Sequence, residues 1–383
     1  MTVTIPAMVN AHSHAFQIDL RGAGERPAPA AHGADDFWSW RTEMFRLASR
    51  HDPDSMRDAG ARAYAQMARA GYGAVGEFHY VHHQPDGTPY EEPNAMALAL
   101  IDAALEQGLE IVLIAAAYHR AGWNGGDLPP VEGQRRFCDP DVEAYLERVE
   151  ALRTWAEHRP GVHVAVAAHS VRAVPASWIE AIATYSRAHG LVRHVHACEQ
   201  RRELDECAAE HGCTPIELLE RTGFLGPAAS VVHAIHVDER DIALLARAST
   251  TVISCPTTEG NLGDGYLPAL RYREAGVPIA IGTDSQVRID PFEEARELET
   301  GARREGLTRH GLLAASGDLW GALVAAGRDS LGLQGPAAEI GVDPAHPDLA
   351  GVELHDLPYA LATCASSAVV TRAASGRAVT RQA

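Results

Sequence analysis

Short hydrophobic runs, many of them rich in β-branched residues, alternate along the chain with longer amphipathic stretches. Runs of the first kind predict buried strands, and stretches with apolar positions three or four residues apart predict helices. The predicted strands cover residues 3–11, 73–78, 110–117, 162–168, 191–195, 230–232, 251–254 and 277–281. Helices are predicted between them, for example over residues 54–70, 94–107, 140–158 and 238–248.

This alternation predicts an α/β protein with a parallel sheet wrapped by helices. Eight such units close naturally into a TIM-type (β/α)8 barrel, whereas an open doubly wound sheet would carry a glycine fingerprint after its first strand. No Gly-x-Gly-x-x-Gly sequence opens a predicted helix. Beyond residue 335 the helical pattern fades, and strand-like segments follow at 368–371 and 377–380. We therefore expect a barrel over residues 1–335 and a β-rich appendage over residues 336–383.

Composition narrows the classes of function. Hydrophobic residues make up 46% and charged residues 22% of the chain, as in a soluble enzyme with a substantial core. The net charge of -18 disfavours nucleic acid as a partner, because phosphate binding needs clustered cations. All 33 basic residues are arginine, so neither a lysine Schiff base nor a carbamylated lysine between two metals can form. The six cysteines are scattered and no apolar stretch approaches the ~20 residues that span a bilayer, so we expect a cytoplasmic protein without a membrane segment.

Histidines and acids lie where the predicted strands end. Side chains at the carboxyl ends of barrel strands converge on one mouth, which is where such barrels hold their active sites. In strand order these residues are His12 and His14, Glu77 and His79, His119, His169, His196, His233, Cys255 and Asp284.

A metal centre is predicted from four of these residues. His12 and His14 form a His-x-His pair on an extended strand, so both imidazoles point to the same side. Together with His196 and Asp284 they supply three imidazoles and one carboxylate, a set suited to Zn2+ or a similar divalent ion. We therefore predict one metal ion per chain, with zinc as the first choice.

These motifs, in this order, resemble those of the amidohydrolase superfamily. They are the His12 and His14 pair, His196 with Glu199 three residues later, His233, and Asp284 in a Gly-Thr-Asp-Ser sequence. The absence of lysine favours the branch that binds a single metal. Residues 12–17, 37–41, 76–80, 169–174 and 255–265 resemble the formimidoylglutamate deiminases in particular.

The resemblance implies hydrolytic deimination of N-formimino-L-glutamate to N-formyl-L-glutamate and ammonia, a step of histidine catabolism, by a homodimer. In such a site a divalent ion lowers the pKa of a water. Asp284 would then be the general base, His233 would polarise the electrophile or orient the hydroxide, and Glu199 would carry a proton to the departing nitrogen.

The implied substrate carries two carboxylates, which call for guanidinium groups that bind them bidentately. Arg41, in the first long loop, and Arg172, just past the fourth strand, are placed to do so. By resemblance Gln17, Tyr80 and His169 complete the substrate pocket. Members of this family usually carry some tens of residues before the first strand, so here either the start is truncated or the β appendage is reduced.

Two alternatives stay open. Another single-metal deaminase or chlorohydrolase, acting on a nucleobase-like or triazine ring, would use the same ligands but would have less use for two arginines. A catalytically inactive barrel that binds a metal or a metabolite would have no need of Glu199, His233 and Asp284.

Overall fold

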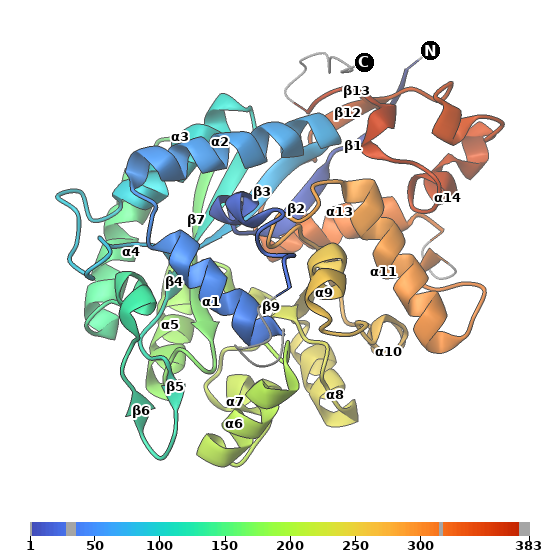
Figure 1. The fold of residues 1–383 in the computed structure, drawn as a ribbon. Coiled ribbons are helices and arrows are strands. Elements are labelled where there is room, and N and C mark those ends of the chain that lie inside the picture. Colours follow the sequence, from blue (N-terminus) through green and yellow to red (C-terminus); the bar gives the residue numbers. More distant parts are fainter. Residues whose placement is uncertain (1, 28–35, 314–316, 375–383) are drawn as a thin grey trace.

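A parallel sheet of eight strands forms the centre of the computed structural model, which describes residues 2–27, 36–313 and 317–374 (Figure 1). Around the sheet the strands follow their order in the chain. They are β2 (Met8–Ser13), β3 (Tyr72–His79), β4 (Glu110–Ala117), β7 (Val162–Ser170), β8 (Arg193–Ala197), β9 (Ala229–His233), β10 (Thr251–Ser254) and β11 (Ile279–Ile281). Sequential order with parallel pairing is the topology of a (β/α)8 barrel.

The carboxyl end of the first barrel strand, β2, meets the segment that follows the last strand, β11, through backbone hydrogen bonds. Asp284 N donates to His12 O at 3.0 Å, and His14 N donates to Asp284 O at 3.0 Å. Gly282 is required at this seam, because a Cβ there would lie 2.6 Å from His12 O. The predicted TIM-type barrel is thus confirmed, and its seam holds His12, His14 and Asp284 side by side.

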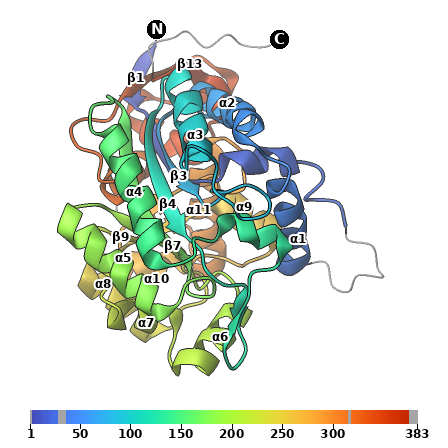
Figure 2. The same ribbon diagram turned by 90° about the vertical axis from the view of Figure 1, so that its left-hand side faces the viewer.

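Helices wrap the outside of the barrel, and Figure 2 shows α3, α4 and α5 along one side of it. The main helices are α1 (Phe37–Ala48), α2 (Pro53–Ala70), α3 (Ala95–Glu106), α4 (Val142–Ala156), α5 (Ala176–His189), α6 (Arg201–His211), α7 (Pro215–Arg221), α8 (Glu239–Ala248), α9 (Pro256–Leu262), α10 (Ala269–Ala275), α11 (Pro291–Gly306), α13 (Leu319–Ser330) and α14 (Leu357–Leu361). Short 3-10 helices cover Ala15–Leu20, Glu132–Phe137, Pro347–Leu349, Leu354–Asp356 and Ser367–Val369.

Local sequence signals explain where these helices begin and end. The α2 helix starts with Pro53, and the side chain of Asp52 accepts a hydrogen bond from Ser55 N, as expected of a capping residue. It stops at Gly71, whose φ of 108° suits glycine. The helices predicted over 54–70, 94–107, 140–158 and 238–248 correspond to α2, α3, α4 and α8 with small shifts at their ends.

The strand predicted over residues 3–11 is wrong in one respect, because the structure divides it in two. Residues Val3–Pro6 form β1, which pairs antiparallel with β12 (Glu339–Val342), and β12 pairs with β13 (Val370–Arg372). Only the following segment, β2, enters the barrel. An apolar run has no feature that marks where a chain leaves one sheet for another.

The three strands β1, β12 and β13 form a small sheet beside the barrel (Figure 1). A predicted strand at 368–371 corresponds to a 3-10 turn followed by β13, and the strand predicted at 377–380 lies outside the described residues. A two-stranded ribbon, β5 (Gly122–Trp123) with β6 (Asp127–Leu128), extends from a loop. The division of the chain at residue 335 stays a prediction. In the part of the chain that is described, no helix has the length and apolarity needed to span a membrane.

Candidate metal centre and active site

A pocket opens at the carboxyl ends of the barrel strands, beneath α1. All the residues predicted for substrate binding and catalysis line this pocket, as do three of the four predicted metal ligands. The fourth, His12, is not part of the lining but lies within hydrogen-bond distance of His14 and His196. The residues that line the pocket are His14, Gln17, Phe37, Trp40, Arg41, Met44, Phe45, Tyr80, His169, Arg172, His196, Glu199, His233, Leu262 and Asp284.

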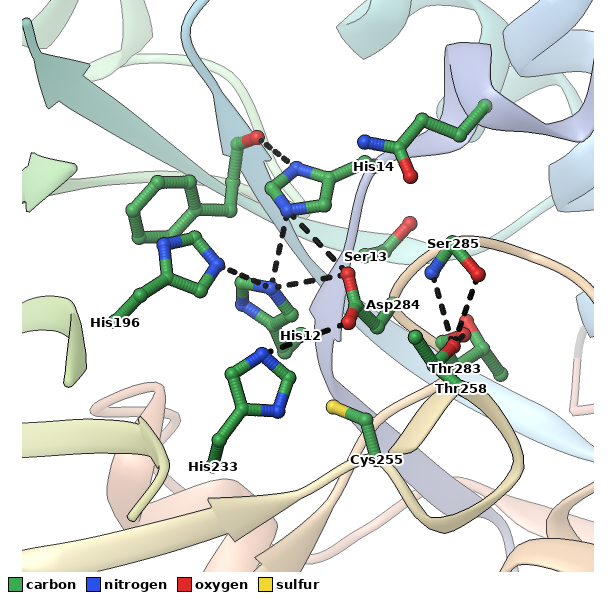
Figure 3. Close-up of polar contacts among 12 residues, drawn as sticks. His12, Ser13, His14, His196, His233, Cys255, Thr258, Thr283, Asp284 and Ser285 are labelled. Carbon is green, nitrogen blue, oxygen red and sulfur yellow. Dashed lines mark hydrogen bonds and ion pairs between the residues drawn. The ribbon is translucent and has the colours of Figure 1, made fainter. Parts of the chain in front are cut away.

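Three imidazole nitrogens meet at one point (Figure 3). His12 Nε2 lies 3.2 Å from His14 Nε2 and 3.1 Å from His196 Nε2. Asp284 Oδ1 lies 3.4 Å from His14 Nε2 and 3.6 Å from His12 Nε2. Nitrogens bound at ~2.0–2.1 Å to one tetrahedral zinc ion are separated by roughly 3.3 Å, so these spacings fit a shared ion.

The far nitrogens of two of these rings are held by carbonyl groups. His14 Nδ1 lies 2.8 Å from Phe78 O, and His196 Nδ1 lies 2.7 Å from His169 O. Because a carbonyl can only accept, each Nδ1 carries the proton and each Nε2 presents a lone pair. Two lone pairs and a carboxylate directed at one point repel each other unless a cation lies between them, so this donor set fits a divalent metal ion.

Burial keeps the imidazoles of these candidate ligands neutral, as metal ligation would require. It lowers the pKa of His12 to about 3 and that of His196 well below its ordinary value. Burial would raise the pKa of Asp284, but its hydrogen bond to His12 and its electrostatic interactions with His12, His14 and His233 hold it well below the usual range. The site therefore presents neutral nitrogens and an ionised carboxylate.

His233 lies between three carboxylates. Its Nε2 is 3.5 Å from Glu199 Oε1 and 3.6 Å from Asp284 Oδ2, and its Nδ1 is 3.2 Å from Glu259 Oε1. Burial opposes charging, but Glu199, Glu259 and Asp284 raise the pKa of His233 to about 10. Burial raises the pKa of Glu199. These groups can therefore hold and move protons at the edge of the metal centre.

Three residues at this site have a left-handed backbone conformation, which sets the direction of their side chains. Cys198, His233 and Asp284 have φ of 58°, 71° and 49°, and all three follow or end barrel strands. Such a conformation costs about 1–3 kcal/mol in a residue other than glycine, and it persists where the surrounding structure enforces it. At Asp284 the enforcing contacts are the backbone hydrogen bonds to His12 and His14 across the seam.

Two arginines form the opposite wall of the pocket. Arg41 comes from α1 and donates from Nη2 to Tyr118 Oη at 3.0 Å. Arg172 is buried against the Phe37 and Trp38 rings, and its Nε has no hydrogen-bond partner among the described residues. Within the described ranges, neither guanidinium has a carboxylate at ion-pair distance, although the chain as a whole is acidic.

Between the metal centre and the arginines lies a polar strip. Gln17 Nε2 donates to Tyr80 Oη at 3.0 Å, which in turn donates to Met44 Sδ at 3.2 Å. Gln17 Oε1 is buried and has no partner in the described part of the chain. The His169 ring packs 5.1 Å from that of Tyr80, and burial together with Arg172 and Arg41 lowers its pKa well below the ordinary value. The strip thus offers a free acceptor and a neutral imidazole.

Not every ionisable residue at a strand end reaches the pocket. His79 is buried beside His82, and His119 packs on Trp178. Cys255 lies near His233 and Glu259, close enough for the three to share an ion, but burial raises the pKa of its thiol and both His233 nitrogens already face carboxylates. We assign no metal to that group.

Glu259 is the functional candidate that sequence reasoning missed. It lies one helical turn after Cys255, on the short helix α9, and accepts hydrogen bonds from Cys255 N at 2.7 Å and from Ser254 Oγ at 2.8 Å. Its position five residues beyond the end of a strand was the available signal. Only the fold shows that the carboxylate meets His233 Nδ1.

Comparisons with known proteins agree with this geometry. Residues 3–316 match the model of the amidohydrolase family. The chain is 37% identical over 333 residues, 86% of its length, to formimidoylglutamate deiminase of Pseudomonas aeruginosa, of which it covers 72%. It is 26% identical to a 5-methylthioadenosine/S-adenosylhomocysteine deaminase of Natronomonas pharaonis, over 93% of this chain and 74% of that protein.

Solved structures give the same picture of the fold. A crystal structure of an amidohydrolase from Brucella melitensis superposes with a TM-score of 0.86 at 32% identity, covering 96% of this chain and 84% of that one. An adenosine deaminase from Xanthomonas campestris with bound zinc gives 0.79 at 22% identity, covering 97% and 79%.

Proposed function

Because this chain belongs to the amidohydrolase family, we propose that it is a metal-dependent hydrolase that converts N-formimino-L-glutamate and water to N-formyl-L-glutamate and ammonia. The proposal rests on one observation above the others. Arg41 and Arg172, which have no carboxylate at ion-pair distance among the described residues, line the same pocket as the proposed metal ligands in an acidic protein. A dicarboxylate is the ligand that such a pair matches in charge and geometry.

His12, His14, His196 and Asp284 would hold one divalent ion, with zinc as the ion that this donor set suits. Such an ion lowers the pKa of water so that hydroxide is available near neutral pH. Asp284 has one carboxylate oxygen toward His14 Nε2 and the other toward His233 Nε2, an arrangement that supports a role as acceptor of the proton of the attacking water.

The remaining proton transfers fall to His233 and Glu199. His233, held at Nδ1 by Glu259, directs Nε2 toward both Asp284 and Glu199 and so orients the attack on the formimino carbon. Glu199 keeps its proton more readily than an exposed acid because it is buried. It can therefore protonate the departing nitrogen, which leaves as ammonia.

The polar strip positions the reacting group. Gln17 Oε1, which has no hydrogen-bond partner among the described residues, can accept an N–H of the formimino group, and Tyr80 and His169 line the same pocket. The two carboxylates of the substrate would then lie against Arg41 and Arg172. A flat nucleobase or triazine ring offers no charge to these guanidinium groups, which favours the dicarboxylate over the ring substrates.

The direct test is an ammonia-release assay on purified protein of known metal content. Metal-replete protein is expected to release ammonia from N-formimino-L-glutamate, to lose this activity on dialysis against a chelator, and to regain it when Zn2+ is added. The same protein should act poorly on adenosine, guanine and triazines. Faster turnover of a ring substrate would contradict the proposal, and metal-replete protein inactive on the whole panel would identify a binding protein instead.

Glu259→Gln tests the support of His233. The amide keeps the size of the side chain but lacks the charge that faces His233 Nδ1. A hydrogen bond to a charged group contributes about 1.5–3 kcal/mol, so we expect kcat to fall roughly 10-fold or more with little change in KM.

The matched control is Glu294→Gln. Glu294 is a buried glutamate on α11 that accepts a hydrogen bond from Thr257 N and does not line the pocket. It should keep the wild-type kcat. Equal kcat values for the two variants would remove Glu259 from the mechanism.

The homodimer and the cytoplasmic location stay predictions.

A further inference from the structure

A chain of buried polar side chains lies directly behind the metal ligands, on the side away from the pocket. Its members are Asn10, Ser13, Glu77, Thr283 and Gln286, each at most 1% exposed. They come from β2, from β3 and from the segment after β11, so the chain crosses the seam where the barrel closes. The mechanism proposed above makes no use of them.

The hydrogen bonds of this chain run in one direction. Thr283 N donates to Asn10 Oδ1 at 3.0 Å, which leaves Asn10 Nδ2 to donate to Thr283 Oγ1 at 2.7 Å. Thr283 Oγ1 donates to Gln286 Oε1 at 2.9 Å. The Thr283 N–H, which can only donate, fixes the orientation of the Asn10 amide, and the Asp284 carbonyl, which can only accept, fixes that of the Gln286 amide.

Gln286 connects these hydrogen bonds to β2, the strand that carries the His-x-His pair. Its Nε2 donates to Ser13 Oγ at 2.9 Å and to Asp284 O at 2.8 Å. Ser13 Oγ donates in turn to Glu77 Oε2 at 2.7 Å, and Ala15 N donates to Glu77 Oε1 at 2.8 Å. A carboxylate, which accepts at both oxygens, thus ends the chain.

Each of these contacts adjoins a metal ligand. Ser13 is the residue between His12 and His14, Ala15 follows His14, and the carbonyl bound by Gln286 is that of Asp284. Asp284 and Gln286 both have left-handed backbones, with φ of 49° and 65°. Such conformations need compensating contacts, which the Gln286 amide supplies.

We propose that Gln286, Ser13 and Glu77 are positioning residues that set the geometry and affinity of the metal centre by joining the His12 and His14 strand to the Asp284 turn. This inference rests on the proposed metal site and adds to it the residues that align its ligands. Buried hydrogen bonds of this kind reinforce one another, and loss of one partner leaves the others unsatisfied.

The test measures Co2+ affinity by competition with a chelator, together with the visible absorption of bound Co2+, which reports coordination geometry. Ser13→Ala removes the link between Gln286 and Glu77 and is expected to weaken Co2+ binding about 10- to 100-fold and to alter the spectrum. The double variant Ser13→Ala/Gln286→Leu should lose little more than the more affected single variant, because both break the same chain.

Ser330→Ala is the matched control. Ser330 is also buried, and its hydroxyl donates to Gly327 O at 2.8 Å on α13, away from the pocket lining. Its loss should lower the Tm without changing Co2+ affinity or the spectrum. If Ser13→Ala likewise loses only thermal stability, the chain is merely structural and the proposal is overturned.

Glu77→Gln replaces Ser13→Ala if the latter does not fold. It keeps the size of the side chain and an acceptor for Ala15 N, but presents an amide donor to Ser13 Oγ, so the serine proton loses its acceptor. Weaker Co2+ binding supports the proposal, and unchanged binding overturns it. Failure of the wild-type protein to bind Co2+ or Zn2+ would refute the metal site itself, a result distinct from equal binding by wild type and variant.

Discussion

Replacing Asp284 with asparagine is expected to lower kcat by about 10³-fold or more, because the change removes the proposed general base and weakens the proposed ligand set together. Asparagine keeps the shape of the side chain, and the backbone hydrogen bonds from Asp284 N to His12 O and from His14 N to Asp284 O do not depend on the carboxylate. The barrel seam should therefore persist. The measurement is kcat by ammonia release, with metal content determined on the same sample.

Asp241→Asn provides the control for a buried aspartate. Asp241 is 1% exposed at the start of α8, where it accepts a hydrogen bond from Thr214 Oγ1, and it does not line the pocket. Burial raises the pKa of Asp241, so the loss of its charge should cost little. We expect wild-type kcat from this variant. Retention of more than a tenth of the wild-type kcat by metal-loaded Asp284→Asn would exclude Asp284 as the base.

Arg172→Met is expected to lower kcat/KM for N-formimino-L-glutamate by about 10²-fold or more. Removal of one partner from a desolvated charge pair costs roughly 2–5 kcal/mol, and Arg172 is buried with no carboxylate at ion-pair distance in the described part of the chain. Methionine keeps the apolar contact with Trp38 and removes the charge. The effect should be much smaller for a formimino compound with one carboxylate, because one of the two arginines then has nothing to bind.

Arg202→Met is the control for the loss of an arginine that contacts the Trp38 ring. The Arg202 guanidinium also lies over Trp38, at 4.3 Å from the ring centroid, but its side chain is 61% exposed and it does not line the pocket. Its replacement should leave kcat/KM within about threefold of wild type. Equal losses on substrates with one and two carboxylates would show that Arg172 acts on the pocket's shape and would remove the main support for a dicarboxylate substrate.

Much of the barrel could be predicted from periodicity. A strand such as β4 is buried along almost its whole length, so its residues form a continuous apolar run that stands out in the sequence. The helix α2 is bounded by Asp52 with Pro53 and by Gly71, which act within one turn and need no tertiary context. The division of residues 3–11 into β1 and β2 could not be predicted, because β1 is defined by its pairing with β12, more than 300 residues away.

The proposed metal ligands and the residues proposed to support them also differ in how far the sequence predicts them. The His-x-His pair and Asp284 carry local signals, since their chemistry is evident from residue type and from position at a strand end. Glu259 and Gln286 carry only a weak signal, their position soon after a strand, because a glutamate or a glutamine at such a place is most often solvated. Their contacts with His233 and Ser13 join segments 26 and 273 residues apart.

The sequence by itself determined the alternation of strands and helices, the residues with the chemistry to bind a metal and two carboxylates, and the absence of lysine chemistry. These properties depend on residue type and on spacing over a few residues. Only the tertiary structure decided which ring nitrogens face one another, where the barrel closes, and which buried side chains support the ligands. Those outcomes depend on distances between atoms remote in the chain, which closure of the barrel sets and no local pattern encodes.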